Sequence, residues 1–217
     1  PGEGHLEALL RSTALGRLGH YGDPDVLNEA QGRFEGYIKG PASLHPDLRA
    51  VVYGLVAQEG GDSTYHTLWE LEKKATLHEE KMRLLGALTR PRDRELLQET
   101  LQRSISEEVR AQDTVLVLTA VAANRYGRDL AWEFIKSNWD ELDRRYGKGG
   151  FMIMRLVSTT QGFTTLERAE EVEQFFKEHP VSAAHRTVQQ SLERIRLNAK
   201  WLERNRKDLE EWFVRRG

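Results

Sequence analysis

Residues 6–40, LEALLRSTALGRLGHYGDPDVLNEAQGRFEGYIKG, contain two amphipathic segments separated by a short turn. The first segment has apolar residues three and four positions apart on one side of a helix; they are Leu6, Leu9, Leu10, Ala14 and Leu18. We expect this helix to stop between Gly19 and Gly22. Asp23-Pro24 then supplies an N-cap residue followed by a first-turn proline, which starts a second helix ending near Gly36–Gly40. The stretch therefore predicts two helices joined by a tight connection.

The remaining sequence repeats this pattern of short helices and breaks, without a convincing strand. Glycine or proline indicates a break at five places: Gly60-Gly61-Asp62, Arg90-Pro91, Tyr126-Gly127, residues 147–150 and His179-Pro180. A further helix is expected over Asp47–Gln58, with Leu48, Val51, Val52 and Leu55 facing inward. The pattern predicts an all-α fold, either a solenoid of antiparallel helix pairs or an irregular helical bundle.

Two predicted helix starts and one long final helix add detail to the predicted all-α fold. Capping boxes are predicted at Ser104 with Glu107 and at Thr164 with Glu167. The last helix has an apolar seam with alternating steps of four and three residues, interrupted by Arg206. The seam consists of Val188, Leu192, Ile195, Ala199, Leu202, Leu209 and Phe213. We expect this helix to dock on the preceding pair, and a coiled-coil dimer is the alternative.

The composition is that of a folded, charged, helix-rich protein. The 217 residues have a net charge of −2, which gives no electrostatic reason to expect nucleic-acid binding. There is no cysteine, and therefore no disulfide or thiol nucleophile. No apolar run reaches the roughly 20 residues that span a membrane, and neither a signal peptide nor an Asn-x-Ser/Thr site occurs. We therefore expect no nucleic-acid partner, no membrane and a cytoplasmic location.

The sequence contains no evident catalytic or metal-binding constellation. None of the seven histidines has a second histidine one helical turn away, and His78-Glu79-Glu80 begins like HExxH but has Met82 at the second ligand position. No serine lies in a Gly-x-Ser-x-Gly or Ser-x-x-Lys context. The carboxylates of Glu79 and Glu80 diverge by about 100° on a helix, so they cannot share a substrate. We predict no metal ion and no activity for this chain alone.

Aromatic residues fall into two groups. Trp132, Phe134, Trp139 and Tyr146 lie within one predicted helix, with Phe151 close behind, and Phe163, Phe175 and Phe176 form the second group. Stripes with this spacing usually pack one helix against another. A peptide-binding groove is the alternative.

Three blocks of sequence resemble the puromycin-sensitive aminopeptidases, which are zinc-dependent enzymes. They are GEGHLEALLRSTALGRLG (residues 2–19), SEEVRAQDTVLVLTAVAANRYGRDLAWEFIKSNWDELDRRYG (106–147) and FFKEHPVSAAHRTVQQSLERIRLNAKWLERN (175–205). The resemblance covers nearly the whole chain, and its specificity lies in the order of the blocks. It implies one domain over residues 1–217 with a HEAT-like or armadillo-like right-handed α-solenoid.

In that family the last domain folds over a thermolysin-like catalytic domain and closes a large cavity. The zinc-binding HExxH motif and the Gly-x-Met-Glu-Asn loop lie upstream, and neither occurs in this sequence. The resemblance therefore implies a non-catalytic C-terminal domain, cut from a longer protein, whose partners are its own catalytic domain and the peptide substrate. Zinc is expected only in the missing catalytic domain.

The resemblance also implies that basic residues of this domain meet the carboxylate of the peptide. The candidates are Arg155, in Phe-Met-Ile-Met-Arg-Leu, and Arg110, in Glu-Glu-Val-Arg. The apolar flanks of Arg155 favour it, because its guanidinium should line the cavity or meet a buried carboxylate; a structural ion pair is the alternative for both. The competing functions are a free-standing helical-repeat adaptor for a protein partner and a self-contained enzyme whose site is assembled from distant helices.

Overall fold

The computed structural model describes residues 4–148 and 150–216, and these form α-helices and short 3₁₀ helices without a strand. The all-α prediction is confirmed. Contacts between Cα atoms divide the chain into two compact units, Pro1–Gly127 and Arg128–Gly217. The prediction of one domain over the whole chain remains a prediction. Residues 1–3, part of the expected boundary within a longer protein, lie outside the described residues.

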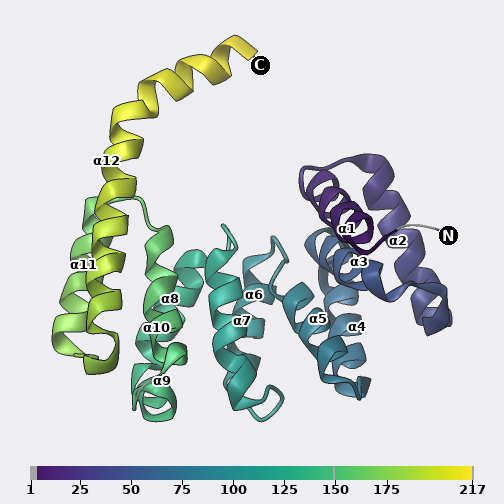
Figure 1. The fold of residues 1–217 in the computed structure, drawn as a ribbon, viewed down its shortest axis with the longest axis horizontal. Helices are drawn as coiled ribbons and strands as arrows, with labels where there is room; N and C mark the ends of the chain where they lie inside the picture. The colour runs from purple at the N-terminus through teal and green to yellow at the C-terminus, as the bar shows by residue number, and fades with distance from the viewer. Residues whose placement is uncertain (1–3, 149, 217) are drawn as a thin grey trace. The chain divides into compact units, whose positions relative to one another are not determined.

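The first unit consists of seven α-helices and one 3₁₀ helix among its described residues (Figure 1). They are α1 (His5–His20), α2 (Pro24–Lys39), η1 (Pro41–Ser43), α3 (Pro46–Glu59), α4 (Gly61–Lys74), α5 (His78–Leu88), α6 (Arg94–Ser104) and α7 (Ala111–Ala123). The start of α2 is as predicted, because Asp23 caps it by accepting a hydrogen bond from the backbone N–H of Val26 at 3.0 Å. Pro24 occupies the first turn.

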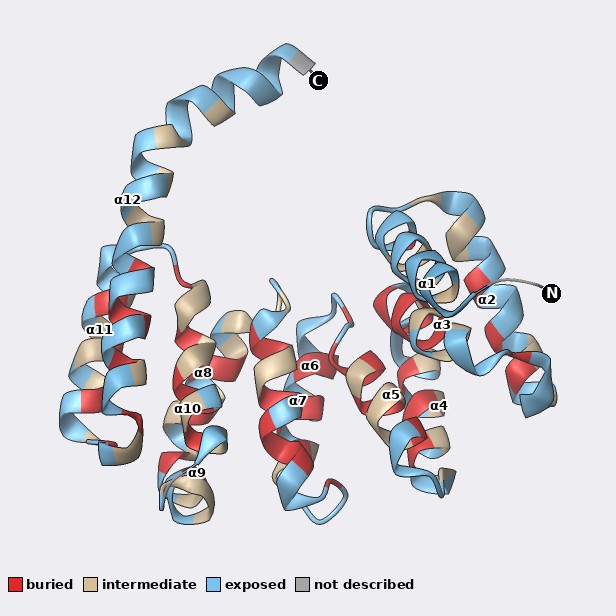
Figure 2. Cartoon of the chain, in the orientation of Figure 1, coloured by how far each residue is buried: buried red, intermediate tan, exposed pale blue. Residues whose placement is uncertain are grey.

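The leucines predicted on one side of α1 face solvent. Leu6, Leu9, Leu10 and Leu18 are 49–76% exposed, and Figure 2 shows α1 as largely exposed. We call these four residues the leucine face. The opposite side of α1 approaches α3 through small residues. A Cβ atom at Gly19 would lie 2.6 Å from the Cδ atoms of Leu55, so a larger residue there would require Leu55 to shift.

Helix α3 is the core of the first unit, as its red colour in Figure 2 shows. Of the residues predicted to face inward, Val52 and Leu55 are buried, whereas Leu48 and Val51 are half-buried. Tyr53, Val56 and Ala57 on other sides of α3 are buried as well. The prediction of a single inward face underestimated this burial, because α3 packs against α1, α2, α4 and α5 together.

Both predicted capping boxes are wrong. Ser104 is the last residue of α6, where its hydroxyl donates to the carbonyl of Leu101 at 2.7 Å, and α7 begins only at Ala111. At the second position the N-cap is Thr165, which accepts from the backbone N–H of Arg168 at 3.3 Å. Thr164 lies one residue too early. In each case a nearby hydroxyl met the motif's spacing while the chain placed another residue at the helix start.

The second unit consists of five α-helices and two 3₁₀ helices among its described residues. They are α8 (Arg128–Ser137), α9 (Trp139–Tyr146), α10 (Phe151–Ser158), η2 (Thr159–Gly162), α11 (Leu166–Glu178), η3 (Ser182–Ala184) and α12 (His185–Arg216). The prediction of one helix from Trp132 to Tyr146 is wrong. Asn138 has φ −115° and ψ 19° and separates α8 from α9, and its side-chain amide donates to the carbonyl of Phe134.

The core of the second unit contains an aromatic cluster formed by Trp132, Trp139, Phe163, Phe175 and Phe176. The Trp132 ring lies 5.1 Å from Phe175 and 6.4 Å from Phe163, centroid to centroid. Two groups that are separate in the sequence therefore pack together, mostly edge to face. Phe151 is exposed and lies outside the cluster.

Helix α12 docks on its neighbours only through its first half. Val188, Leu192 and Ile195 are buried, and the side-chain amide of Asn198 donates to the carbonyl groups of Gln161 and Phe163 at 2.9 and 3.1 Å. No residue from Arg196 to Arg215 is buried. The predicted docking is thus confirmed for the first three residues of the seam. The later residues of the seam are not buried in this chain. Within the described residues, no helix has the length and apolar character needed to cross a membrane.

Candidate functional site

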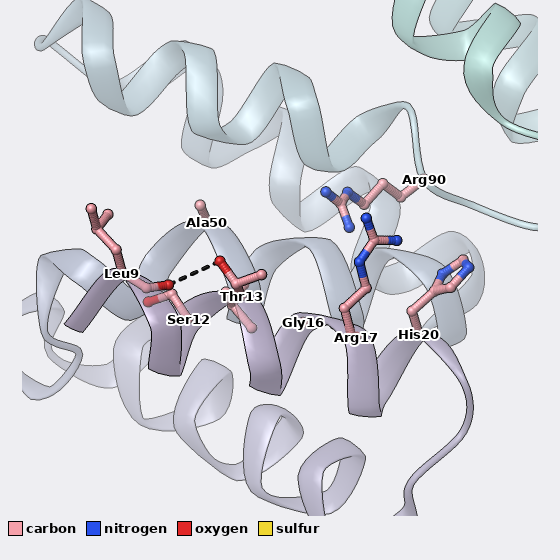
Figure 3. Close-up of a pocket in the computed structure, with 9 residues that line it drawn as sticks. Leu9, Ser12, Thr13, Gly16, Arg17, His20, Ala50 and Arg90 are labelled. Carbon is pink, nitrogen blue, oxygen red and sulfur yellow. Dashed lines mark hydrogen bonds between the residues drawn. The ribbon is translucent and has the colours of Figure 1, made fainter. Parts of the chain in front are cut away.

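A pocket of about 430 Å³ lies beside α1 in the first unit. Figure 3 shows that α1, α3 and the segment after α5 contribute to it. It is lined by Leu9, Ser12, Thr13, Gly16, Arg17, His20, Ala50, Val51 and Arg90. Its walls are thus partly apolar, and its charged groups lie at the end of α1 and at the break before Pro91.

The guanidinium groups of Arg17 and Arg90 point toward each other across the pocket (Figure 3). Neither forms an ion pair with a carboxylate in the described part of the chain. Arg90 reaches this position over α3, since a Cβ atom at Gly54 would lie 3.0 Å from its Cδ atom. Partial burial and then the charge of Arg17 lower the pKa of Arg90. Both side chains remain cations at neutral pH.

The remaining polar groups of the pocket have partners within the protein. The Ser12 hydroxyl donates to the carbonyl of Asp47, and the Thr13 hydroxyl donates to that of Leu9, each at 2.9 Å. The Nδ1 atom of His20 lies 2.9 Å from Oε1 of Gln58, within hydrogen-bond distance. The guanidinium groups of Arg17 and Arg90 are therefore the charged donors of the pocket that have no carboxylate partner among the described residues.

The predicted candidates Arg110 and Arg155 do not line this pocket. Arg110 is the N-cap of α7, and its Nε donates to Oδ2 of Asp113 at 2.8 Å while its guanidinium also contacts His78. Arg110 thus has the structural ion pair that was considered as the alternative. Arg155 lies on α10 with an exposed side chain, and the expected buried carboxylate partner is not found among the described residues.

Sequence reasoning missed Arg17 and Arg90. Neither belongs to a motif, and the two are 73 positions apart in the sequence. The available signal was indirect: Gly19 and Gly54 mark places where helices and side chains approach closely. Such glycines predict a close contact but do not identify the cations that it brings together.

Two buried or half-buried carboxylates are already neutralised within the fold. Glu80 on α5 accepts from Tyr53 at 2.6 Å, from Arg83 at 2.9 Å, and lies 3.3 Å from Arg49. Burial alone would raise its pKa, but the Tyr53 hydrogen bond and the two arginines outweigh that effect and lower it. Burial and the contact with Glu80 raise the pKa of Tyr53. The cluster holds α3 and α5 together.

Glu171 on α11 plays the corresponding part in the second unit. It accepts from Lys136 at 2.5 Å, from Arg168 at 2.6 Å and from the indole of Trp132 at 2.9 Å. These contacts outweigh its burial and lower the pKa of Glu171 to about 2. In the part of the chain that the structure describes, no group of three or more His, Asp or Glu residues could hold a metal ion.

Comparison with known proteins gives a consistent result. The sequence model of a family described as ERAP1-like C-terminal domain matches residues 1–197. Aminopeptidase M1-A of Oryza sativa subsp. japonica is 37% identical over 211 residues, which are 94% of this chain and 24% of the relative. Aminopeptidase M1 of Arabidopsis thaliana is 34% identical over 213 residues, with 95% and 24% covered.

Relatives also occur in mammals. Glutamyl aminopeptidase of Homo sapiens is 32% identical over 212 residues, which are 96% of this chain and 22% of the relative. The chain therefore spans about a quarter of the length of the curated relatives that it matches.

Proposed function

This chain belongs to the ERAP1-like C-terminal domain family of aminopeptidases, and from that premise we propose that it is the non-catalytic C-terminal domain of a zinc aminopeptidase. In this role it packs on the catalytic domain, encloses the active-site cavity and helps to bind the peptide substrate. Enclosure would exclude bulk water around the zinc ion and select substrates by size. The zinc ion itself would be held by the catalytic domain.

The observation that supports docking most directly is the leucine face of α1. Its four leucines are 49–76% exposed, and no other described residue covers them. Several exposed leucines on one helix are typical of a surface that another protein covers. Each leucine covered by a partner would contribute about 1.5–3 kcal/mol when fully buried. The leucine face is therefore the proposed contact with the rest of the enzyme.

The proposed repeat architecture is a right-handed solenoid of HEAT-like or armadillo-like helix pairs. Within the first unit, consecutive helices pack against each other, as α3 does on α4 and α6 on α7. Within the second unit, α11 packs on α12. This sequential packing supports a stack of antiparallel pairs, in which each pair needs its neighbours to bury its apolar surface.

Arg155 and Arg110 differ as proposed contacts for the peptide. Arg155 is exposed on α10 and has no ion pair among the described residues, so its charge is available to a substrate carboxylate. Arg110 already binds Asp113, whose side chain is mostly buried. A substrate would have to compete with that carboxylate. Arg155 is therefore the stronger of the two candidates. The cytoplasmic location expected from the sequence stays a prediction.

The test is to mix this chain with the matching catalytic region lacking its C-terminal domain, and to measure association and peptide hydrolysis. We expect the chain alone to be inactive, and to associate with the catalytic region and restore or reshape its activity. Replacing Leu6 and Leu10 together by aspartate should abolish association, since it places two charges in the contact. Leu77→Asp is the matched control, because Leu77 is also highly exposed but lies outside the leucine face.

Three results would contradict the proposal. Stoichiometric zinc with peptide cleavage by the chain alone would show an enzyme assembled from its own residues. Unchanged association of the double leucine variant would remove the leucine face from the interface. Failure of the wild-type chain to associate at all would favour the adaptor hypothesis.

A further inference from the structure

We propose that an exposed side of α12 binds the surface of an anionic lipid membrane. The residues concerned, here called the cationic face, are Arg194, Leu197, Lys200, Trp201 and Arg204, and all five line one hollow of about 390 Å³ on this helix. The expectation of no membrane rested on the absence of a spanning segment, and a helix that lies on a membrane surface needs none. The cationic face belongs to the second unit, so the proposal is independent of the leucine face in the first.

The three cations of this face have no carboxylate beside them. Within the described part of the chain, no ion pair joins any of their side chains to an acidic residue. Their neighbour Arg196 does have such a partner, since its guanidinium lies 2.6 Å from a carboxylate oxygen of Glu173 on α11. Residues 194–207 contain six Lys or Arg and one Asp or Glu. The cationic face therefore attracts an anionic partner.

Exposed apolar side chains lie between these cations. Leu197 and Trp201 each expose more than half of their surface. Arg194 and Arg204 precede and follow them by three residues, so the four positions share one side of the helix. Arginine and lysine next to tryptophan are typical of helices at a lipid interface, where the cations reach the headgroups and the indole lies just below them. This combination fits an anionic lipid surface.

The same side of α12 has a second exposed tryptophan, in the half that Figure 2 shows as largely exposed. Trp212 follows Trp201 by 11 residues, which is about three helical turns and about 16 Å along the axis. A single phosphate ion or headgroup cannot contact both indoles, whereas an extended surface can. Asp208 lies between them on this side, so one acidic residue opposes the three cations and the net charge stays positive. The geometry therefore favours a membrane over a small anion.

The experiment measures sedimentation of the full 217-residue chain with lipid vesicles. One set contains phosphatidylcholine alone, and the other contains equal parts of phosphatidylcholine and phosphatidylserine. We expect binding to the anionic set to be at least about tenfold stronger, because three cations face a negative surface, and to weaken at high salt. Tryptophan emission should shift to shorter wavelength on binding, since Trp201 and Trp212 leave water while the other three tryptophans are already buried.

Arg204→Gln and Arg206→Gln form a matched pair of variants. Two successive alternate positions on a helix point about 160° apart, so Arg206 faces away from the cationic face. It is also exposed and without an ion pair among the described residues. Arg204→Gln should weaken binding to the anionic vesicles by about fivefold, whereas Arg206→Gln should leave it nearly unchanged. Trp201→Ala should weaken binding and reduce the emission shift. All three residues are exposed, so the variants should fold normally, which circular dichroism checks.

The leucine face is another exposed apolar surface, so the variant with both Leu6→Asp and Leu10→Asp is tested as well and should bind the anionic vesicles as the wild type does. Three results would overturn the proposal: no preference of the wild-type chain for anionic vesicles, equal losses in Arg204→Gln and Arg206→Gln, or loss of binding only in the leucine variant. Displacement by soluble glycerophosphoserine would assign the cationic face to a free headgroup and would also overturn it. These measurements need no catalytic region, so their failure leaves the docking test unaffected.

Discussion

The first unit contains two arginine pairs with opposite surroundings. Arg49 and Arg83 both contact Glu80, whose carboxylate is nearly buried between α3 and α5. Arg17 and Arg90 point toward each other in the pocket beside α1, without a carboxylate among the described residues. The first pair is complete within the fold, and the second has the same positive groups but lacks the negative one. The difference indicates which arginines stabilise the protein and which are available to bind something else.

Removing the carboxylate from the complete cluster should have the largest effect. Glu80→Ala leaves Arg49, Arg83 and the Tyr53 hydroxyl without their shared acceptor, and breaking a buried ion pair in this way costs about 3–5 kcal/mol. We expect the free energy of unfolding, measured by urea titration, to fall by about 3 kcal/mol, since the two arginines keep partial contact with water. Glu79→Ala is the control, because its side chain is 77% exposed. An equal loss of unfolding free energy in Glu80→Ala and Glu79→Ala would contradict the special role of the buried carboxylate.

Lowering the pH should remove the stabilising contribution of Glu171 in the second unit. The pKa of Glu171 is lowered to about 2, so its contacts stabilise the fold above its unfolded pKa of about 4.5 and are lost as the pH falls toward 2. Solvent screening reduces the effect to about 1–2 kcal/mol. Thermal unfolding measured between pH 5 and pH 2 should show this loss, and Glu171→Gln should lower stability at pH 5 and flatten the pH dependence. A variant with the same pH profile as the wild type would exclude Glu171 as its source.

Gly19→Ala tests how much stability depends on the close approach of α1 to α3. Its Cβ atom would lie 2.6 Å from the side chain of buried Leu55, and overpacking of this kind costs about 1–3 kcal/mol. The gain in helix propensity of about 1 kcal/mol offsets part of it. We expect a net loss of about 1 kcal/mol in urea titration. Gly32→Ala on α2 is the control, because a Cβ atom there meets no neighbour.

Removing one cation from the incomplete pair should have the smallest effect, with the opposite sign. Arg17→Gln relieves repulsion from Arg90, so in the absence of a ligand it should stabilise the chain by about 0.5 kcal/mol at low salt. The increase should disappear at high ionic strength, where exposed charges are screened. Thermal unfolding at two salt concentrations measures it. A clear loss of stability at low salt would show that Arg17 has a favourable partner in the free protein.

The sequence predicted the positions of the helices more accurately than the contacts that each helix makes. Apolar spacing and the Asp23-Pro24 pair placed α1, α2 and the start of the connection correctly, because helix periodicity and capping are local. The same spacing could not show that the leucine face lies outward, since an apolar side has the same pattern whether or not a partner covers it. The capping boxes failed for different reasons: Ser104 ends α6 instead of starting a helix, and Thr165 caps α11 in place of its neighbour Thr164.

The candidate site was the least predictable part. Arg17 and Arg90 come from elements far apart in the sequence, and each is an ordinary arginine among many. Glu80 was visible only as half of an adjacent carboxylate pair with Glu79, although one of the two is buried and the other exposed. The two aromatic groups became one cluster only through the packing of α8, α9 and α11. All of these features depend on contacts between residues that are far apart in the sequence.

The second half of α12 lacks the buried contacts that stabilise the rest of the second unit. After Asn198 the helix continues through residues 199–216 for about 27 Å, at 1.5 Å per residue, and none of residues 199–215 is buried. A helix that stands alone in water is only marginally stable, and its helicity falls gradually with temperature. This half should therefore undergo a broad helix–coil transition well below the cooperative unfolding of its own unit. Warming would shorten the ordered part of α12 before the core around Ile195 changes, and this segment would act as the chain's most temperature-sensitive surface.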